Sequence, residues 1–461
     1  MEKKEEILRV RNLDISFETT AGVVNAVRGV NLTVNRGETV AIVGESGSGK
    51  SVSAKAIMGI LAKNGTIDRG QITFSYYRNP EERVTREILQ MKKEEIRRHI
   101  NGKRIAMVFQ DPMTSLNPLM PVGKQIMEGM IWHYHTPKEE AYKKALELMK
   151  LVGITDAEKR IKNYPHQLSG GMRQRIVIAI ALACDPELLI CDEPTTALDV
   201  TVQAQILTLL RELRDELDMS LLFITHNLSI VKKLADSVAV MQNGRCVEQN
   251  TASTLLNAPQ HPYTQRLLDS EPSGDPVPLT ADSTPLLRVD DLSVSFPIRK
   301  GVLRRIVDQN PVLKNIRFSL RPGESLGLVG ESGSGKSTTG LALLRLIASQ
   351  GEILFDDMPL HRWNRRQMLP VRPRMQVVFQ DPNSSLNPRL SVLQIIEEGL
   401  RVHQPDLSAQ QREQEVMRVM AEVGLDPDTR HRYPAEFSGG QRQRISSSKG
   451  KKCPSSDIKS A

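Results

Sequence analysis

The string GESGSGKS occurs twice in the chain, at Gly44–Ser51 and at Gly330–Ser337. It fits the pattern G-x-x-x-x-G-K-[ST], in which glycines let backbone N–H groups curl around phosphates, Lys reaches the outer phosphate oxygens and Ser meets Mg²⁺. Each copy follows an apolar run typical of a strand, ETVAIV at 38–43 and ESLGLV at 324–329. We therefore predict two strand–loop–helix units that bind nucleotide phosphates.

The composition is that of a globular protein. The 461 residues are enough for two or three domains, with 39% hydrophobic and 25% charged residues. No run approaches about 18 apolar residues, and the start MEKKEEILRV lacks the apolar core of a secretory signal, so we expect a cytoplasmic chain. The cysteines, Cys184, Cys191, Cys246 and Cys453, form no C-x-x-C pair and indicate neither disulfides nor zinc. The net charge of +8 is compatible with binding to an anionic membrane face or to nucleic acid, and it does not distinguish between these two partners.

A whole domain is duplicated along the chain. The order GESGSGKS, then VFQDP, then SGG is kept in both halves. The matching positions are Gly44 and Gly330, Gln110 and Gln380, and Ser169 and Ser438. A repeat of this length is a duplicated domain and not a short solenoid.

Composition changes mark the domain boundaries. We predict a complete first domain at 1–267, a linker at 268–285, a second domain at 286–445 and an aberrant tail at 446–461. The linker is rich in Pro, Ser, Asp and Thr and has no periodicity. The tail has six Ser and four Lys in sixteen residues, and we expect no regular structure there.

The stretch between VFQDP and LSGG is predicted to be helical. Thr136-Pro137-Lys138-Glu139 has the pattern of a capping box with Pro at the first helical position, and Gly153 ends the run. His133 and His135 are predicted to be solvated residues near a helix start and not metal ligands. The apolar face of the predicted helix contains Ala141, Ala145, Leu148, Met149 and Val152.

Two short apolar runs, Leu188–Cys191 and Leu221–Ile224, are bounded by polar residues and are typical of buried parallel strands. Strands that alternate with helices predict an α/β core, here with a helical insertion.

On these motifs the chain resembles a tandem ATP-binding-cassette (ABC) ATPase of the peptide, oligopeptide and nickel importer class. The first domain carries six motifs of that family in order: the loop Gly44–Ser51, Gln110, LSGGMRQR at 168–175, LLICDE ending at Asp192 and Glu193, ALD at 197–199, and His226. QHPYTQRLL at 260–268 is similar to the tail of oligopeptide-import ATPases. Runs such as FITHNLSIVKKLADSVAVMQNGRCVEQN and IEEGLRVHQP are similar to Yej-type ATPases of microcin C and peptide importers.

The resemblance implies a fold and a set of site residues. The fold would be two P-loop NTPase domains, each with a RecA-like core, an antiparallel β subdomain and a helical insertion, the second incomplete. The implied cofactors are ATP and Mg²⁺, with Ser51, Asp192 and Gln110 at the metal. Glu193 would act on the attacking water, and His226 and Gln110 complete the catalytic set. Phe17 and Phe296 fit either adenine stacking or core packing.

The implied nucleotide-binding positions form two composite sites. In family dimers each ATP lies between the phosphate loop of one cassette and the SGG segment of the other. The positions are Gly44, Glu45, Ser46, Gly47, Ser48, Gly49, Lys50, Ser51 and Phe17 in the first domain, Gly330, Glu331, Ser332, Gly333, Ser334, Gly335, Lys336, Ser337 and Gln380 in the second, and Ser169, Gly170, Gly171, Ser438, Gly439 and Gly440 in the two SGG segments.

The second half breaks the family pattern after Ile445, where no counterpart of LLICDE, ALD or the His226 motif follows. We predict that its site does not hydrolyse ATP. A missing strand would expose apolar surface and unpaired backbone groups, so we expect residues 286–445 to be marginally folded or prone to aggregate.

Three functions follow from the resemblance. The first is an importer ATPase on the cytoplasmic face of the inner membrane, with two integral-membrane permease subunits as partners and a periplasmic peptide-binding protein as an indirect one. The second is an inactive or regulatory remnant, and homodimerisation through the first domain is left open. The third is a tandem cassette acting on nucleic acid or ribosomes; the lack of a C-x-x-C module and of a long charged arm disfavours it, and we expect no specific nucleic-acid partner.

Overall fold

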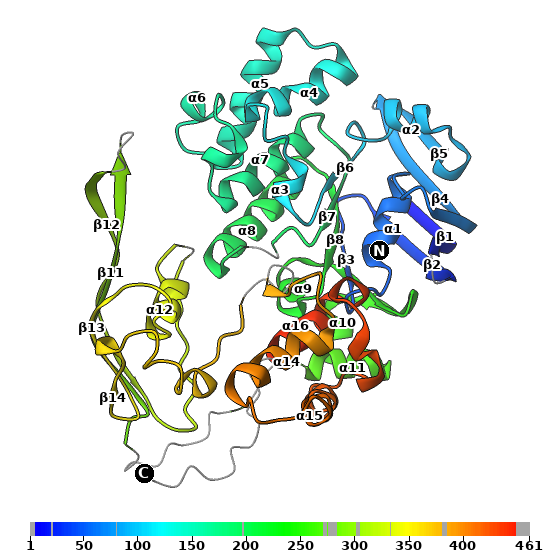
Figure 1. The fold of residues 1–461 in the computed structure, drawn as a ribbon. Helices are drawn as coiled ribbons and strands as arrows, with labels where there is room; N and C mark the ends of the chain where they lie inside the picture. The colour runs from blue at the N-terminus through cyan, green and yellow to red at the C-terminus, as the bar shows by residue number, and fades with distance from the viewer. Residues whose placement is uncertain are drawn as a thin grey trace. The chain divides into compact units, whose positions relative to one another are not determined.

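The structure is a computed structural model that describes residues 5–19, 22–79, 81–195, 198–270, 274, 284–300, 305–331, 333–379 and 385–448. The chain divides into two compact units, Met1–Asp275 (unit 1) and Pro276–Ala461 (unit 2) (Figure 1). Four predictions fall outside the described residues: Ala197 of the ALD motif, Ser332, Gln380 and the tail from residue 449. Most of the predicted linker also lies outside them.

Unit 1 is built on a six-stranded sheet with the order β10-β9-β3-β8-β7-β6. The strands are β3 (Thr39–Val43), β6 (Ile105–Val108), β7 (Leu188–Asp192), β8 (Ser220–Thr225), β9 (Ser237–Gln242) and β10 (Arg245–Thr251). All run parallel except β10, which forms an antiparallel hairpin with β9. Every residue of β3, β7 and β8 is buried, as expected for strands covered on both faces. The predicted strands at 188–191 and 221–224 are confirmed.

A second, antiparallel sheet has the order β2-β1-β4-β5. Its strands are β1 (Glu6–Thr19), β2 (Gly22–Asn35), β4 (Gly65–Asn79) and β5 (Glu82–Glu87). Its apolar face packs on the parallel sheet through a shared core that includes Leu8 and Phe74 on one side and Ile42 and Ile190 on the other. This arrangement confirms the predicted antiparallel subdomain beside an α/β core.

The helices of unit 1 complete the α/β architecture. They are α1 (Lys50–Ile57), α2 (Lys93–His99), α3 (Pro112–Ser115), α4 (Val122–Tyr134), α5 (Lys138–Leu151), α6 (Ala157–Arg160), α7 (Gly170–Leu182), α8 (Val200–Glu216), α9 (Leu228–Leu234), α10 (Ala252–Asn257) and α11 (Pro262–Asp269), with 3₁₀ turns at Ile88–Gln90 and Pro165–Gln167. Helices α4 to α6 form the predicted insertion, and α4 and α5 pack beside α7 (Figure 1).

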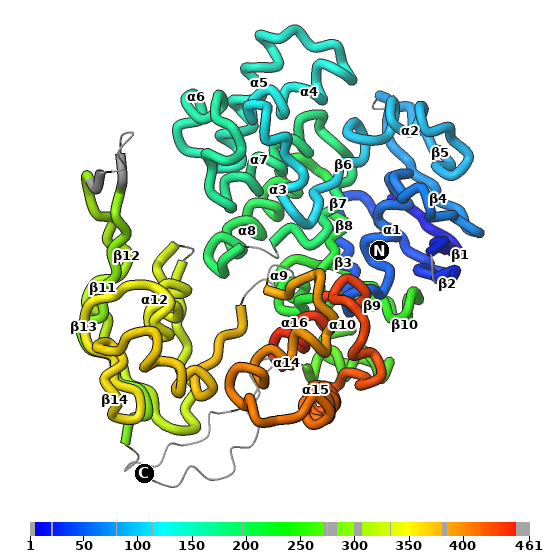
Figure 2. The backbone as a smooth tube through the Cα atoms, viewed as in Figure 1, coloured from blue at the N-terminus to red at the C-terminus, as the bar shows by residue number. Residues whose placement is uncertain are grey.

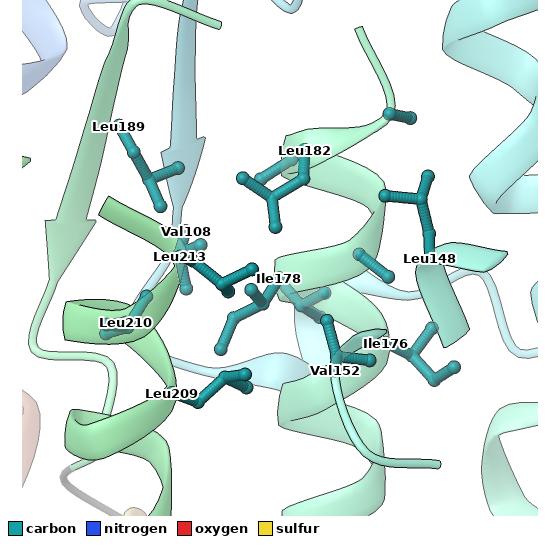
Figure 3. Packing of buried hydrophobic residues seen from close by; sticks show 14 of the residues in the cluster. Val108, Leu148, Val152, Ile176, Ile178, Leu182, Leu189, Leu209, Leu210 and Leu213 are labelled. Atoms are coloured by element: carbon teal, nitrogen blue, oxygen red, sulfur yellow. The ribbon is translucent and has the colours of Figure 1, made fainter. Parts of the chain in front are cut away.

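A large apolar core ties the insertion to the parallel sheet. Figure 3 shows Ile178 and Leu182 of α7 between Leu210 and Leu213 of α8 and Leu148 of α5. All five side chains are buried. The sheet contributes Val108 of β6 and Leu189 of β7 to the same cluster, so the strands that carry site residues are held from behind by packed helices.

The start of α5 corrects one prediction. The helix begins at Lys138 with Pro137 as its N-cap, so Thr136 is not the cap and Pro137 is not the first helical residue. The Thr136 hydroxyl donates instead to the carbonyl of Met130 in α4, at 3.2 Å, because the two helices are joined by a tight turn. His133 and His135 lie at the end of α4 and not at a helix start.

Unit 2 contains an antiparallel sheet with the order β12-β11-β13-β14 and a separate set of helices. The elements are β11 (Leu287–Lys300), β12 (Arg305–Leu320), α12 (Lys336–Leu343), β13 (Gln350–Phe355), β14 (Met358–Pro359), α14 (Val392–His403), α15 (Ala409–Glu422) and α16 (Gly439–Ser448), with 3₁₀ turns at Leu360–Arg362, Arg372–Arg374, Pro427–His431 and Pro434–Glu436. The sheet packs on one small core and α14 to α16 on another.

Two predictions for unit 2 are wrong. ESLGLV at 324–329 was expected as a strand, but the backbone there is irregular (Figure 2), because no described strand of unit 2 pairs with it. Helix α16 continues to Ser448, beyond the expected end at Ile445. Adding residues to a formed helix costs little, and Ser446 and Ser448 are buried against the unit.

None of the helices in the described part of the chain has the length and apolarity that crossing a membrane requires.

Candidate active site

The first GESGSGKS forms a tight loop between β3 and α1. Gly44 has φ of 149°, and a Cβ there would lie 2.1 Å from the Met241 carbonyl oxygen, so only glycine fits. Gly49, with φ of 98°, is the N-cap of α1. The Lys50 ammonium turns back over the loop and donates to the carbonyls of Gly44 and Glu45, at 2.7 and 2.8 Å. The loop therefore closes around the Lys50 ammonium at the end of the buried strand β3.

Lys50 is a buried cation among carboxylates. Its exposed fraction is 5%. Burial lowers the pKa of Lys50, and the nearby carboxylates of Glu193, Asp192 and Glu45 oppose that shift. A cation in such a position compensates the negative charge of groups that gather at the loop.

The next residue joins the loop to β7. The Ser51 hydroxyl donates to the Asp192 carboxylate, with 2.8 Å between Oγ and Oδ1. Burial raises the pKa of Asp192, while the Ser51 hydrogen bond lowers it. A serine hydroxyl and a carboxylate side by side are oxygen ligands of the kind that Mg²⁺ prefers.

Two residues that follow different strands meet at Glu193, which follows β7. The Gln110 amide after β6 donates to Glu193 Oε2 at 3.1 Å, and His226 Nδ1 after β8 lies 3.2 Å from Glu193 Oε1. The backbone of Glu193 is left-handed, with φ of 48°, and its N–H donates to the Ile224 carbonyl. A non-glycine residue in this region is strained, and such strain is common at functional sites.

Electrostatics couples His226 to Glu193. The hydrogen bond to Glu193 raises the pKa of His226, and burial opposes the rise. The Glu193 side chain is 14% exposed whereas that of His226 is 56% exposed. Gln110 and His226 hold the Glu193 carboxylate in position. A carboxylate held in this way can accept a proton from a bound water.

The loop has the features of a phosphate cradle. The Ser48 hydroxyl is buried and has no hydrogen-bond partner in the described structure. Gly47 has φ of 83° and open space where a Cβ would lie, so a ligand can approach the backbone there. These features, with Lys50 and the Ser51–Asp192 pair, fit a nucleotide with its Mg²⁺.

Tyr263 is a site neighbour to which sequence reasoning gave no role. It lies on α11, it is buried, and its hydroxyl accepts the Glu45 N–H at 3.0 Å. The chain just before α11 is fixed by the Glu248 carboxylate, which accepts the N–H groups of Gln260 and His261. The unusual segment QHPYTQRLL was the available signal, and its tyrosine supports the phosphate loop.

The SGG segment of unit 1 lies at the start of α7. Ser169 is the N-cap, and its hydroxyl accepts the Met172 N–H at 3.3 Å. Ser169 and Gly170 are exposed, so the N-terminus of the helix is open to an anionic group. Phe17 is half-buried and packs on Gly65, which leaves adenine stacking and core packing both open.

The second GESGSGKS repeats the lysine hydrogen bonds of the first loop. Lys336 donates to the carbonyls of Gly330 and Glu331, at 2.6 and 2.7 Å, as Lys50 does in unit 1. Ser337 is exposed. Ser438 caps α16 and accepts the Gln441 N–H, and Gly439 and Gly440 are exposed. Phe296 is 44% exposed.

Comparison with known proteins agrees with this geometry. The ABC transporter family matches residues 27–196 and 313–448. The chain is 62% identical to the "Uncharacterized ABC transporter ATP-binding protein YejF" of Escherichia coli K12, over 96% of this chain and 82% of that protein. It is 49% identical to the "Peptidoglycan transport ATP-binding protein YejF" of Agrobacterium fabrum, over 96% and 79%. It is 44% identical to the "Glutathione import ATP-binding protein GsiA" of Pectobacterium atrosepticum, over 96% and 74%. The chain belongs to the ABC transporter family, as a tandem ATP-binding protein of its ATP-hydrolysing class.

Proposed function

We propose that this chain hydrolyses ATP in unit 1 to drive import of peptides or peptide-derived solutes through two membrane permease subunits. The observation that carries the proposal is the cluster of Gln110, Glu193 and His226 beside the Ser51–Asp192 pair. Two relatives are named for peptidoglycan transport and glutathione import, and both of these solutes contain amide-linked amino acids. Microcin C, suggested by the Yej-type resemblance, stays a prediction.

The roles of the loop residues follow from their charges. Lys50 and the loop N–H groups bind the phosphates, and Ser51 and Asp192 hold Mg²⁺. When bound, Mg²⁺ neutralises charge on the outer phosphates. Sequence reasoning also assigned Gln110 to the metal. Its side-chain amide donates to Glu193, so Gln110 is proposed to respond to what binds at the metal position and at Glu193.

Glu193 is the proposed general base. Its carboxylate accepts the proton of the attacking water, and Gln110 and His226 fix its orientation through both oxygens. His226, which lies beside Glu193, is proposed to contact the outermost phosphate when nucleotide is bound.

The permease partner is proposed to dock in a groove beside the insertion. This groove, of about 980 Å³, lies between α2 and α4. Its apolar side chains include Met120, Met127, Ile131 and Trp132, and its cationic ones are Arg98, Lys103, Lys124 and Lys138. Among the described residues that line it, Glu128 is the one acidic side chain. A cytoplasmic permease helix with apolar and acidic side chains is the complementary occupant, and it would place the chain on the cytoplasmic face of the membrane.

Two arrangements would complete the nucleotide site. Unit 2 supplies Ser438–Gly440 to the first loop, or a second copy of the chain supplies Ser169–Gly171 through a homodimer of unit 1. In both, exposed N–H groups at a helix N-terminus meet the phosphates. A periplasmic binding protein would take part only through the permease.

A second candidate function is a remnant that binds nucleotide without turnover. The observation in its favour is the exposure of the apolar run before the second loop, where Leu328 is 47% and Val329 94% exposed. Such a surface is typical of an incompletely formed sheet.

Turnover of Mg·ATP by the full chain tests both functions. We expect Glu193→Gln to lower turnover by about 10²–10⁴-fold and to leave ATP binding intact, because it removes the base but keeps the shape of the site. Lys336→Ala serves as the matched change in unit 2 and should leave turnover within about twofold. Nucleotide binding without turnover in the unchanged chain would favour the remnant.

A further inference from the structure

Helices α4 and α14 are counterparts in the internal repeat. Each follows the string SLNP. The N–H groups of their first residues, Val122 and Val392, donate to the carbonyls of Asn163 and Arg432, at 2.9 and 3.0 Å, and each acceptor precedes a Tyr-Pro pair. The two helices therefore begin at equivalent places in their units, and their side chains can be compared position by position.

Three apolar positions of unit 1 carry charges in unit 2. In unit 1 all three side chains belong to the apolar core of the insertion or pack against it. A charge at only one of these positions would lie half-buried without a partner, so the exchange has to be concerted. The matching pairs are Met127 and Glu397, Ile131 and Arg401, and Ala141 of α5 and Arg412 of α15, the last aligned on Gly153 and Gly424 after the two helices.

The three charges of unit 2 form one cluster. Arg412 Nε donates to Glu397 Oε1 at 2.6 Å, and Arg401 Nε donates to the same oxygen at 3.1 Å. The Glu397 side chain is 9% exposed. Burial raises the pKa of Glu397, but the hydrogen bonds from Arg412 and Arg401 outweigh it and hold that pKa below its ordinary value. The cluster is therefore ionised, and its outer member Arg401 faces water with 65% of its side chain exposed.

The same positions of unit 1 line the groove beside α4 with apolar groups. Met127 and Ile131 lie in this lining together with Trp132, which is 44% exposed. Lys124, one of the cations of the groove, corresponds to Gln394 in unit 2. An apolar helix with acidic side chains can therefore cover the lining of unit 1 without removing water from a buried ion pair, and it meets cations beside that lining.

We propose that Met127 and Ile131 direct an apolar, acidic helix of the membrane partner to unit 1, and that the Glu397–Arg401–Arg412 cluster excludes the same helix from unit 2. The inference rests on the proposed function only for the identity of the partner. Apolar side chains laid over Arg401 would remove its water without giving it a new hydrogen-bond acceptor, which disfavours binding there. One chain should therefore bind one such helix.

The test titrates the full chain with a labelled synthetic helix that has leucines along one face and glutamates near one end. Fluorescence anisotropy should give one peptide bound per chain. A matched peptide with lysines in place of the glutamates should bind about tenfold more weakly or less, because the groove is lined by cations. Two equivalent peptides per chain, or equal affinity for the two peptides, would overturn the proposal.

A matched pair of substitutions tests the lining itself. Ile131→Arg installs the residue of unit 2 and should weaken binding of the acidic peptide by about tenfold or more. Leu119→Arg also installs the residue of unit 2, Arg389, but Leu119 is 86% exposed and is not among the lining residues, so the Kd should change less than about threefold. Both changes add one positive charge, so a difference between them reports the apolar contact. Equal effects of the two changes would overturn the proposal.

Turnover of Mg·ATP is measured on the same preparations. A chain that turns over ATP but binds no peptide, or binds two equivalently, would overturn this inference and leave ATP hydrolysis in unit 1 standing. One peptide per chain without turnover would support the selective groove and count against the proposed ATPase function.

Discussion

Replacing Tyr263 by Phe removes one oxygen atom from beneath the phosphate loop. The hydroxyl accepts the Glu45 N–H at 3.0 Å, and the ring is 3% exposed, so the phenyl group keeps its packing. A hydrogen bond of this kind contributes about 0.5–1.5 kcal/mol. Glu45 is exposed, so water can replace the lost acceptor, and we expect a cost of about 1 kcal/mol.

That cost has two measurable consequences. In calorimetry of the full chain, one unfolding transition should shift when ATP is added, and we expect the Tm of that transition to fall by about 2–4 °C. In a fluorescence titration, the Kd for ATP should rise about fivefold, because the loop loses part of its pre-organisation. Tyr142→Phe is the matched control, since Tyr142 packs against the core and its hydroxyl has no hydrogen bond in the described part of the chain. Equal Kd and Tm values for the two variants would refute this role for Tyr263.

Three further predictions concern unit 1. Glu193 raises the pKa of His226 in the folded state above its ordinary value of 6.5. The stability that this interaction contributes is therefore fully present below the unfolded-state pKa of His226 and is lost as pH rises through the folded-state pKa. The Tm difference between the chain and His226→Gln should therefore shrink from pH 5 to pH 9, and a difference independent of pH would contradict this. Ser51→Ala removes a proposed oxygen ligand of Mg²⁺ beside Asp192, so ATP binding should lose most of its dependence on Mg²⁺ in titrations with and without EDTA; an unchanged dependence would show that Ser51 does not hold the metal. Leu210→Ala should cost about 2–5 kcal/mol in urea unfolding, because Leu210 is fully buried, whereas Leu217→Ala at a half-exposed site should cost under about 1 kcal/mol; similar losses would contradict the packing in Figure 3.

Local sequence determined the conformation of both phosphate loops. The two copies of GESGSGKS have nearly the same glycine φ values, 149°, 83° and 98° in unit 1 and 156°, 82° and 95° in unit 2. In both, the lysine donates to the same two carbonyls. The sequence alone is sufficient here because glycines with positive φ and hydrogen bonds across six residues or fewer fix the loop.

The catalytic cluster could be predicted as a set of residues but not as a geometry. Gln110, Glu193 and His226 were identified from motifs, yet their hydrogen bonds depend on β6, β7 and β8 being neighbours in one sheet. Tyr263 was missed for the same reason, since its partner Glu45 lies far away in the sequence. Contacts of this range are set by packing and strand order, which periodicity does not encode.

Whether the strand before each loop forms was decided only by tertiary structure. ETVAIV and ESLGLV have the same apolar pattern, and the sequence predicted a strand in both places. In unit 1 the run is β3, buried between β8 and β9; in unit 2 it is irregular and exposed, with no strand beside it among the described residues. A parallel strand has no hydrogen bonds of its own, so its partners, distant in the chain, determine whether it exists.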